Sequence, residues 1–253
     1  MPVPSARARL DIVLVERGLV PSRERARAVI LAGQVTVDGQ VVAKAGALVR
    51  DQARVELVTP DHPYVGRGGV KLAAALDAFA VDPLDRRALD IGASTGGFTD
   101  VLLRRGAASV IALDVGRGQL DWRLRTDPRV IVREGVNARH LTRNAVPHEV
   151  SLVTVDVAFI SLGHILPALP PFLEDGADIV TLVKPQFEAD RKEVGKHGLV
   201  TNPAIHEAVI ARVTDVAGAI GLTRAAMAPS TITGATGNQE FFLHFRNVIA
   251  AAR

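Results

Sequence analysis

Neither cysteine nor a long apolar run is present in this chain of 253 residues. Without cysteine, a disulfide framework and a thiolate metal site are both excluded. A membrane-spanning helix needs about 20 consecutive apolar residues, and the opening residues MPVPSARARLD lack the apolar segment of a signal peptide. We therefore expect a cytoplasmic protein that does not enter the membrane.

Several catalytic motifs are also missing. None of the seven histidines has a partner at a metal-ligand spacing such as H-E-x-x-H, so we expect no metal site. We interpret His62, His140 and His244 as loop or surface residues. The P-loop lysine motif and the G-x-S-x-G motif of hydrolases are both absent. With one Trp and one Tyr, the chain is not expected to bind nucleic acid mainly by stacking many bases.

The length and the apolar fraction of 48% leave room for two folded domains. Two prolines within residues 59–63 indicate a linker, so we expect domains at 1–58 and 67–253 with a linker at 59–66. Residues 1–58 hold nine basic and six acidic side chains, a surplus that equals the net charge of +3 of the whole chain. A basic module beside a neutral one indicates a polyanionic partner such as nucleic acid, although a solvated charged helix face gives the same pattern.

The first domain has the pattern of two helices followed by a β-hairpin. Apolar residues recur at helical spacing from Leu10, and Ser22 is suited to cap a second helix that ends near Gly33. Asp38-Gly39 between two runs rich in valine is a strong hairpin signal. A further strand is expected at residues 54–58.

The second domain alternates strand and helix patterns, which predicts a doubly wound α/β sheet. A helix is expected from a glycine-rich turn through Phe79, and another from Asn202-Pro203, where Asn can cap and Pro can take the first helical position. The last two strands have no helix between them, so we expect them to pair antiparallel. The expected strands are 88–91, 109–113, 130–133, 152–155, 179–183, 222–227 and 241–245.

The segment from Asp90 to Asp100, DIGASTGGFTD, is the most informative part of the chain. An apolar strand runs into three glycines and then into a helix-compatible segment, as in cofactor-binding α/β folds. The spacing departs from the dinucleotide fingerprint G-x-G-x-x-G, because Ser94 replaces the second glycine, which makes room for a pyrophosphate. The loop therefore favours a nucleoside cofactor without phosphates, such as S-adenosylmethionine.

Polar residues stand at the ends of several expected strands, where such sheets bind ligands. Asp114, 22 positions after Gly92, can accept hydrogen bonds from ribose hydroxyls, although NAD enzymes use the same geometry. Asp90 and Asp156 suit a cationic sulfonium, but a strand-end Asp can equally cap a helix. Asn137 could contact an adenine or serve only in a turn. These four residues are followed by Lys184, which can point into the crevice or form an ion pair at the sheet edge, and by Glu240.

Five motifs resemble those of the TlyA family of ribosomal-RNA ribose methyltransferases, once labelled haemolysins. The resemblance covers nearly the whole chain, and the motifs stand in the order of the family. They are Arg67-Gly-Gly-Val-Lys71-Leu72, the segment Asp90–Thr99, Asp156-Val-Ala-Phe-Ile-Ser-Leu162, Val183-Lys-Pro-Gln-Phe-Glu188 and Gly237-Asn-Gln-Glu-Phe241. Two positions depart from the family, because Gly66 and Ala158 stand where serine is usual.

The resemblance implies a small α+β RNA-binding domain like that of ribosomal protein S4 at 1–58. It implies that an FtsJ-like, Rossmann-like S-adenosylmethionine-dependent methyltransferase domain follows. It also implies 2′-O-methylation of cytidine in large-subunit rRNA, and in some members small-subunit rRNA. A catalytic tetrad would fall on Lys71, Asp156, Lys184 and Glu240. Lys184 would lie next to the hydroxyl, either as a cation that stabilises the oxyanion or as a neutral base.

From these motifs we expect the protein to bind S-adenosylmethionine and the rRNA of ribosomal subunits. We expect it to be a monomer. Three other readings stay open: a non-enzymatic ribosome-assembly protein, a membrane-active haemolysin and an NAD-dependent enzyme. The expected cofactor-binding residues are Asp90, Gly92, Ser94, Thr95, Gly96, Gly97, Phe98, Asp114, Asn137 and Asp156. The expected RNA-binding residues are Arg7, Arg9, Arg23, Arg27 and Arg67.

Overall fold

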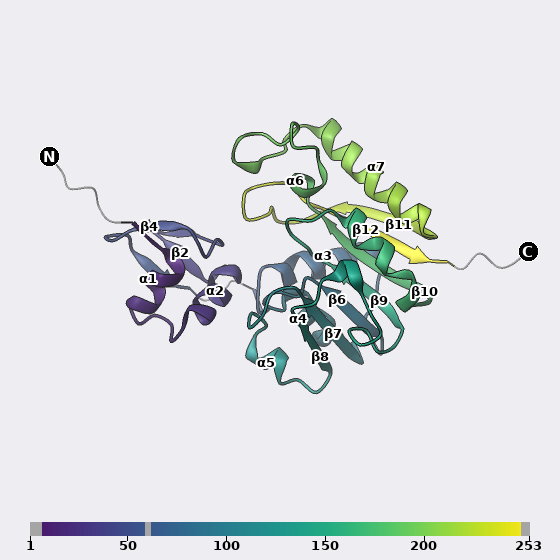
Figure 1. Ribbon diagram of the computed structural model, residues 1–253, viewed down its shortest axis with the longest axis horizontal. Helices are drawn as coiled ribbons and strands as arrows, with labels where there is room; N and C mark the ends of the chain where they lie inside the picture. The colour runs from purple at the N-terminus through teal and green to yellow at the C-terminus, as the bar shows by residue number, and fades with distance from the viewer. Residues whose placement is uncertain (1–6, 59–61, 249–253) are drawn as a thin grey trace, which may run out of the picture.

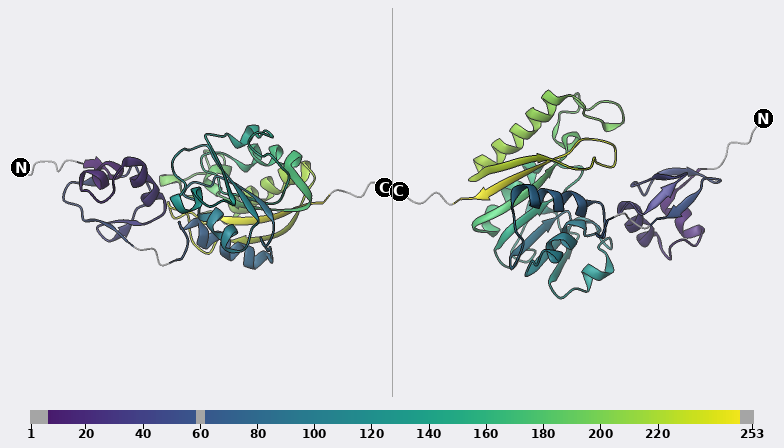
Figure 2. Two further views of the ribbon diagram at one scale, coloured as in Figure 1. Left: turned by 90° about the horizontal axis from the view of Figure 1, so that it is seen from below. Right: turned by 180° about the vertical axis from the view of Figure 1, so that it is seen from behind.

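The computed structural model describes residues 7–58 and 62–248, which form two domains joined by a short linker (Figure 1). Figure 2 shows the N-terminal domain at one end of an elongated molecule and the larger domain at the other. Each domain has its own apolar core, and the N-terminal core is centred on Leu10, Leu14 and Ile30, none of which is exposed. Burying one such side chain contributes about 1.5–3 kcal/mol, so this core stabilises the small domain.

The N-terminal domain confirms the predicted two helices and hairpin. Helix α1 is Leu10–Glu16 and α2 is Arg23–Leu31, and the Ser22 hydroxyl accepts the Arg25 N–H at 3.2 Å as the expected cap. Asp38 and Gly39 both have positive φ in the hairpin turn. The sheet β3-β2-β5 combines Gln40–Val41, Val35–Val37 and Val55–Leu57. A second pair, β1 (Arg7–Arg9) with β4 (Leu48–Arg50), was not expected from the sequence.

The larger domain is built on a seven-stranded sheet in the order β11-β12-β10-β9-β6-β7-β8. Strands β6 to β10 are parallel to one another, while β12 pairs antiparallel with both β10 and β11. The predicted doubly wound sheet and its antiparallel last pair are therefore confirmed. The strands are β6 (Arg87–Ile91), β7 (Ser109–Asp114), β8 (Val130–Glu134), β9 (Val150–Val155), β10 (Leu173–Val183), β11 (Leu222–Pro229) and β12 (Phe241–Asn247).

Both faces of this sheet are covered. Alternate residues of each strand point to opposite faces, so they pack into different apolar clusters. Leu89 and Ile91 belong to the cluster under α7, whereas Ala88 belongs to the cluster under the helices of the other face. Those helices are α3 (Gly68–Phe79), α4 (Gly97–Arg104) and α5 (Trp122–Arg125), and α7 is Pro203–Ala219. The Asn202 side chain caps α7 as predicted, accepting the Ala204 N–H at 3.0 Å.

The connection between β9 and β10 contains short 3₁₀ turns where a doubly wound fold usually has an α-helix. These turns are Leu162–His164, Leu166–Ala168 and Pro170–Phe172. A continuous α-helix is disfavoured here by three prolines, which lack a backbone N–H and whose rings would clash with the preceding helical turn. They are Pro167, Pro170 and Pro171. The connection nevertheless buries Leu166 and Leu169 against the sheet, so it covers that face as a helix would.

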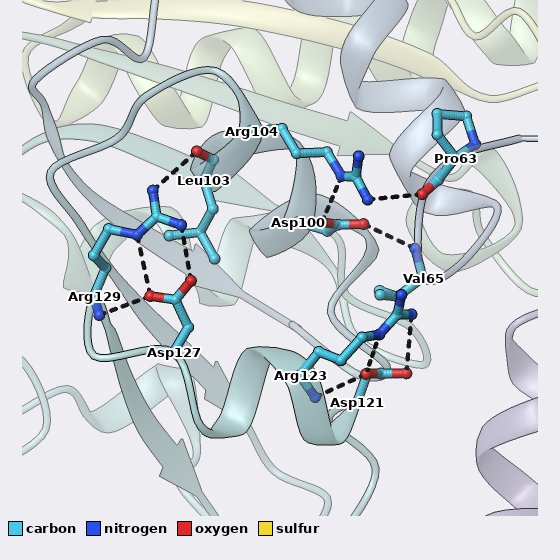
Figure 3. A network of polar contacts seen from close by, with 9 residues as sticks. All are labelled: Pro63, Val65, Asp100, Leu103, Arg104, Asp121, Arg123, Asp127 and Arg129. Carbon is cyan, nitrogen blue, oxygen red and sulfur yellow. Dashed lines mark hydrogen bonds and ion pairs between the residues drawn. The ribbon is translucent and has the colours of Figure 1, made fainter.

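The second half of the expected linker is attached to α4 (Figure 3). The buried Asp100 accepts the Val65 N–H at 3.0 Å and pairs with Arg104 at 2.8 Å, and Arg104 also donates to the Pro63 carbonyl at 3.0 Å. Beside them, Asp121 pairs with Arg123 and Asp127 with Arg129. Pro63 and Val65 of the expected linker are thus held by the larger domain, while 59–61 lie outside the described residues.

The interpretation of His244 as a loop or surface residue is wrong. His244 lies in β12, an inner strand, and is 3% exposed. Its Nε2 contacts Asp178 at 2.7 Å, its ring stacks on Phe79, and Asp178 also pairs with Arg86 at 2.7 Å. The cluster joins the start of β6 to β10 and β12. A polar side chain is tolerated at this depth because each group has a charged or hydrogen-bonding partner.

Candidate active site

The glycine loop between β6 and α4 approaches its neighbours too closely for any larger residue. Gly92 has φ +84°, and a Cβ there would come within 2.1 Å of the Asp156 carbonyl oxygen. Gly96 has φ +96°, and a Cβ there would meet Leu124 at 2.2 Å. Both positions therefore require glycine for conformation and for space. The result is a tight turn that brings the end of β6 against the end of β9.

Ser94, the residue that departs from the dinucleotide pattern, takes a left-handed conformation with φ +48°. Its backbone N–H donates to Asp114 Oδ2 at 2.8 Å, and the Gly116 N–H donates to Asp114 Oδ1 at 2.6 Å. Asp114 ends β7 and is partly exposed, so its carboxylate both braces the loop and keeps lone pairs for a ligand. The next residue, Val115, is 74% exposed beside it.

Asp90 is placed below the loop, with its side chain completely buried. Its carboxyl oxygens accept hydrogen bonds from Thr99 Oγ1 at 2.7 Å and Thr154 Oγ1 at 2.9 Å. Burial raises the pKa of Asp90 to about 7, against the lowering effect of these two hydroxyls. Asp90 thus ties α4 to β9 under the loop, and its side chain does not face open space.

The other residues expected to bind cofactor take different places around the loop. Thr95 precedes α4 and is buried, whereas Gly97 and Phe98 are its first two residues. The Phe98 ring is 3% exposed and packs 6.1 Å from the ring of Phe242, so it points into the core. Asn137 is exposed after β8, and its side chain accepts the Arg139 N–H at 3.0 Å, so it caps the 3₁₀ turn Ala138–His140. The sequence pattern identified the loop but not which side chains it buries.

Four charged residues from four different elements meet at the carboxyl edge of the parallel strands. Lys71 on α3 contacts Glu240, just before β12, with Nζ 2.5 Å from Oε2. Lys184, just after β10, contacts Asp156, just after β9, with Nζ 2.5 Å from Oδ1. All four side chains are largely buried, with exposed fractions from 3% to 23%. The site therefore consists of two lysine–carboxylate pairs beside the glycine loop.

The pairs influence each other through Lys184. Burial alone would lower the pKa of Lys184, but its ion pair and hydrogen bond with Asp156, together with the charge of Glu240, raise it above its ordinary value. The side chain is then an ammonium at neutral pH. Of the two roles expected for Lys184, the raised pKa favours the cation.

The sequence matches two known families over these same two domains. Residues 64–247 match the FtsJ-like methyltransferase family, and residues 8–55 match the S4 domain family. The protein called 16S/23S rRNA (cytidine-2′-O)-methyltransferase TlyA of Mycobacterium tuberculosis is 47% identical to this chain, over 95% of this chain and 90% of that protein. This chain belongs to the TlyA family of FtsJ-like methyltransferases.

Two further TlyA-like proteins carry the older name. Hemolysin A of Brachyspira hyodysenteriae is 39% identical over 94% of this chain and 99% of that protein. A solved structure of a protein titled a haemolysin, from Streptococcus thermophilus, is 41% identical with a TM-score of 0.75, covering 97% of this chain and 90% of that one. Among residues 7–58 and 62–248, no helix is long and apolar enough to cross a membrane, and no cluster of side chains is suited to a metal ion.

The two departures from the TlyA pattern lie at different depths. Gly66 is buried, and a Cβ there would lie 2.9 Å from Thr95 Oγ1, so a serine would have to displace this threonine of the glycine loop slightly. Ala158 is exposed on the loop after β9. The tetrad is intact, and the change at Gly66 affects packing between α3 and the glycine loop.

One prominent aromatic residue was not recognised from the sequence. Phe159 lies on the loop after Asp156, is 90% exposed and has φ +65°. Its ring lies 5.1 Å from that of Phe187, which follows Lys184 by three positions. Positive φ is costly for a bulky residue, so the loop holds Phe159 outward against both its backbone preference and its apolar character. Such strain concentrates at functional sites.

The expected RNA-binding arginines are only partly brought together. Arg9, Arg23 and Arg27 surround the buried carboxylate of Asp11 at 2.9, 3.2 and 3.5 Å, and each keeps about half of its side chain exposed. The Arg9 hydrogen bonds hold the pKa of Asp11 well below its usual range. Two other arginines stand apart from this cluster: Arg7 faces Arg50 across the β1–β4 pair, and Arg67 precedes α3 and donates to the Thr233 carbonyl.

Proposed function

We propose that this protein transfers a methyl group from S-adenosylmethionine to the ribose 2′-oxygen of cytidine in rRNA. The substrate is large-subunit rRNA and also small-subunit rRNA, in keeping with the two-subunit name of the mycobacterial relative. The observation that carries this proposal is the convergence of Lys71, Glu240, Lys184 and Asp156 beside the glycine loop. Alcohol methylation needs a hydroxyl to lose its proton as the bond forms, and paired ammonium and carboxylate groups supply that chemistry.

The chemistry of the loop fits S-adenosylmethionine. Asp114 can accept hydrogen bonds from two ribose hydroxyls at the end of β7, as acids at this place do in nucleoside-binding folds. The exposed Val115 beside it suits the face of an adenine. No side chain is needed for phosphates, and the carboxylate of Asp156 lies where a sulfonium would be stabilised. When bound, S-adenosylmethionine supplies an electrophilic methyl group.

Lys184 is the group that we place at the acceptor hydroxyl. As an ammonium held by Asp156, it would donate a hydrogen bond to the 2′-oxygen and stabilise the negative charge that grows there. The proton of the 2′-hydroxyl would pass to a carboxylate, and Asp156, 2.5 Å from Lys184 Nζ, is the candidate for it. Lys71 and Glu240 would complete the charge balance, so that the four groups act as one unit whose mutational effects do not add.

The acceptor nucleotide also needs a place for its base, because proteins that recognise unstacked RNA bases commonly stack them on aromatic side chains. Phe159 is the candidate, since an exposed ring beside Asp156 and Phe187 offers an apolar face to an unstacked base. The arginines around Asp11 would bind backbone phosphates and so position the RNA without reading its sequence.

The variant Lys184→Ala tests the proposal, with Lys192→Ala, an exposed lysine outside the site, as its control. We expect K184A to lose methyl transfer to ribosomal subunits while S-adenosylmethionine binding, measured by calorimetry, stays within about threefold of wild type. K192A should behave as wild type. Measurable turnover by K184A would exclude the proposed role of Lys184, and preferential binding of NAD would exclude the proposed cofactor.

A further inference from the structure

Glu188 is a buried carboxylate near the site that the proposed chemistry does not use. It ends α6 (Pro185–Glu188), the single helical turn that directly follows Lys184, and it is 7% exposed. A buried carboxylate is costly unless it is hydrogen-bonded, and burial raises the pKa of Glu188 above its ordinary value in spite of its hydrogen bonds. Its contacts should therefore explain why it is there.

Both of its oxygens are used to hold the loop that begins at Asp156. Ser161 Oγ donates to Glu188 Oε2 at 2.6 Å, and the Leu162 N–H donates to Oε1 at 2.7 Å. The Glu188 backbone is held in turn, because Arg212 on α7 donates to its carbonyl at 2.7 Å. The loop is fixed at its other end as well, where the Asp156 N–H donates to the Ile91 carbonyl at 2.9 Å.

The chain from Asp156 to Leu162 is thus clamped at both ends, with Phe159 between them in its left-handed conformation. The contacts at the Leu162 end are made by Glu188, which lies in the same helical turn as Phe187, and the Phe187 ring lies against that of Phe159. Lys184 and Glu188 are four residues apart across α6. Movement of the Glu188 end of the loop would therefore displace Phe159 and alter the 2.5 Å contact between Lys184 and Asp156.

We propose that Glu188 is a positioning residue for methyl transfer. It holds the loop 156–162 against α6, which fixes Asp156 relative to Lys184 and presents Phe159 to the acceptor nucleotide, without itself touching substrate or cofactor. The inference rests on the proposed function for its catalytic part. Its structural part, the clamp on the loop, can be tested independently.

The test compares Glu188→Ala, Glu188→Gln and Ser161→Ala with Glu207→Gln, an exposed glutamate on α7, as control. Small misplacement of reacting groups costs up to about 100-fold in rate, so we expect E188A to lower kcat by about 10- to 100-fold. Gln can accept from the Leu162 N–H and donate to Ser161 Oγ, so E188Q should recover to within about threefold of wild type. S161A should fall between them, and cofactor affinity should change less than kcat, staying within about threefold of wild type in every variant.

Hydrogen exchange provides a readout that needs no activity. In E188A, amide exchange in a peptide covering 156–163 should speed up by about tenfold or more, while a peptide covering 92–100 stays as in wild type. A kcat within twofold of wild type for E188A would overturn the proposal. So would an exchange rate of the 156–163 peptide in E188A that equals the rate in wild type. If wild-type protein methylated no ribose, the proposed function would fall, and the exchange data would still decide whether Glu188 holds the loop.

Discussion

The ionisation of Asp90 should make the stability of the larger domain depend on pH in a particular direction. The folded-state pKa of Asp90 is about 7, raised mainly by burial, whereas an unfolded chain has a pKa of about 3.9 for Asp. Between these values the unfolded state releases a proton that the folded state keeps. Stability therefore falls as pH rises from about 4 to about 7 and levels off above, where both states are ionised.

The variant Asp90→Asn removes this titration while keeping partners for Thr99 and Thr154, because an amide can accept from one hydroxyl and donate to the other. From the two pKa values, the wild type loses about 2–3 kcal/mol relative to D90N between pH 5 and pH 8. Urea unfolding followed by the fluorescence of Trp122, the single Trp and part of α5, reports this domain.

The quantity compared is the difference in the free energy of unfolding between D90N and wild type, followed as the pH changes. The titration of all other groups then cancels to first order. A stability difference between D90N and wild type that stayed constant within about 0.5 kcal/mol from pH 5 to pH 8 would refute the reasoning, since that is the usual additivity error. It would mean that Asp90 is ionised throughout and that its pair of hydroxyls outweighs its burial.

Three further predictions concern other parts of the molecule. Lys184, whose pKa is raised, is expected to act as an ammonium, so kcat for methyl transfer should stay level between pH 7 and pH 9. The neutral fraction of a lysine grows about tenfold per pH unit below its pKa, so a tenfold rise in kcat per pH unit would mean that Lys184 acts as a neutral base. Burial alone would raise the pKa of Asp178, but hydrogen bonds from His244 and Arg86 lower it to about 2. Asp178→Asn should therefore cost about 2–3 kcal/mol in urea unfolding at pH 7, and the cost should shrink as pH falls toward 2; an equal cost at pH 3 would contradict this. Deleting residues 1–58 should weaken rRNA binding strongly in a filter-binding assay at moderate salt and leave cofactor affinity intact, so unchanged RNA affinity would exclude the arginines around Asp11 as the main contact.

Local sequence signals were sufficient where an element is specified by its own residues. The hairpin at Asp38-Gly39, the cap at Ser22 and the cap at Asn202 each depend on a turn or capping residue that is visible in the sequence. The buried strands β6, β7 and β9 are mostly apolar segments that alternate with helical patterns, so their existence and their parallel arrangement could also be predicted.

Features that depend on partners distant in the sequence could not be predicted. The strands β1 and β4 are three residues long and form because Arg7–Arg9 meets Leu48–Arg50 after the chain has turned. His244 resembles a surface histidine until Asp178, 66 residues away, is placed against it. Glu188 is similar, because only the folded loop reveals that both its oxygens are bound.

The candidate site shows the same limit. The strand-end rule placed Asp156, Lys184 and Glu240 at one edge of the sheet, but not the pairing of Lys71 with Glu240 across 169 residues. The role of Asp90 also changed, because only the structure reveals the two buried threonine hydroxyls beneath the loop. No pattern in the sequence distinguishes the exposed Phe159 from an ordinary core phenylalanine.

The most direct test of the account is to map ribose methylation by mass spectrometry on rRNA from unmodified ribosomal subunits. The subunits are incubated with S-adenosylmethionine and either wild-type protein or K184A. New 2′-O-methylcytidine should appear at defined positions with the wild type and at none with K184A. Methylation on a base, methylation of another nucleotide, or the same pattern with both proteins would contradict it.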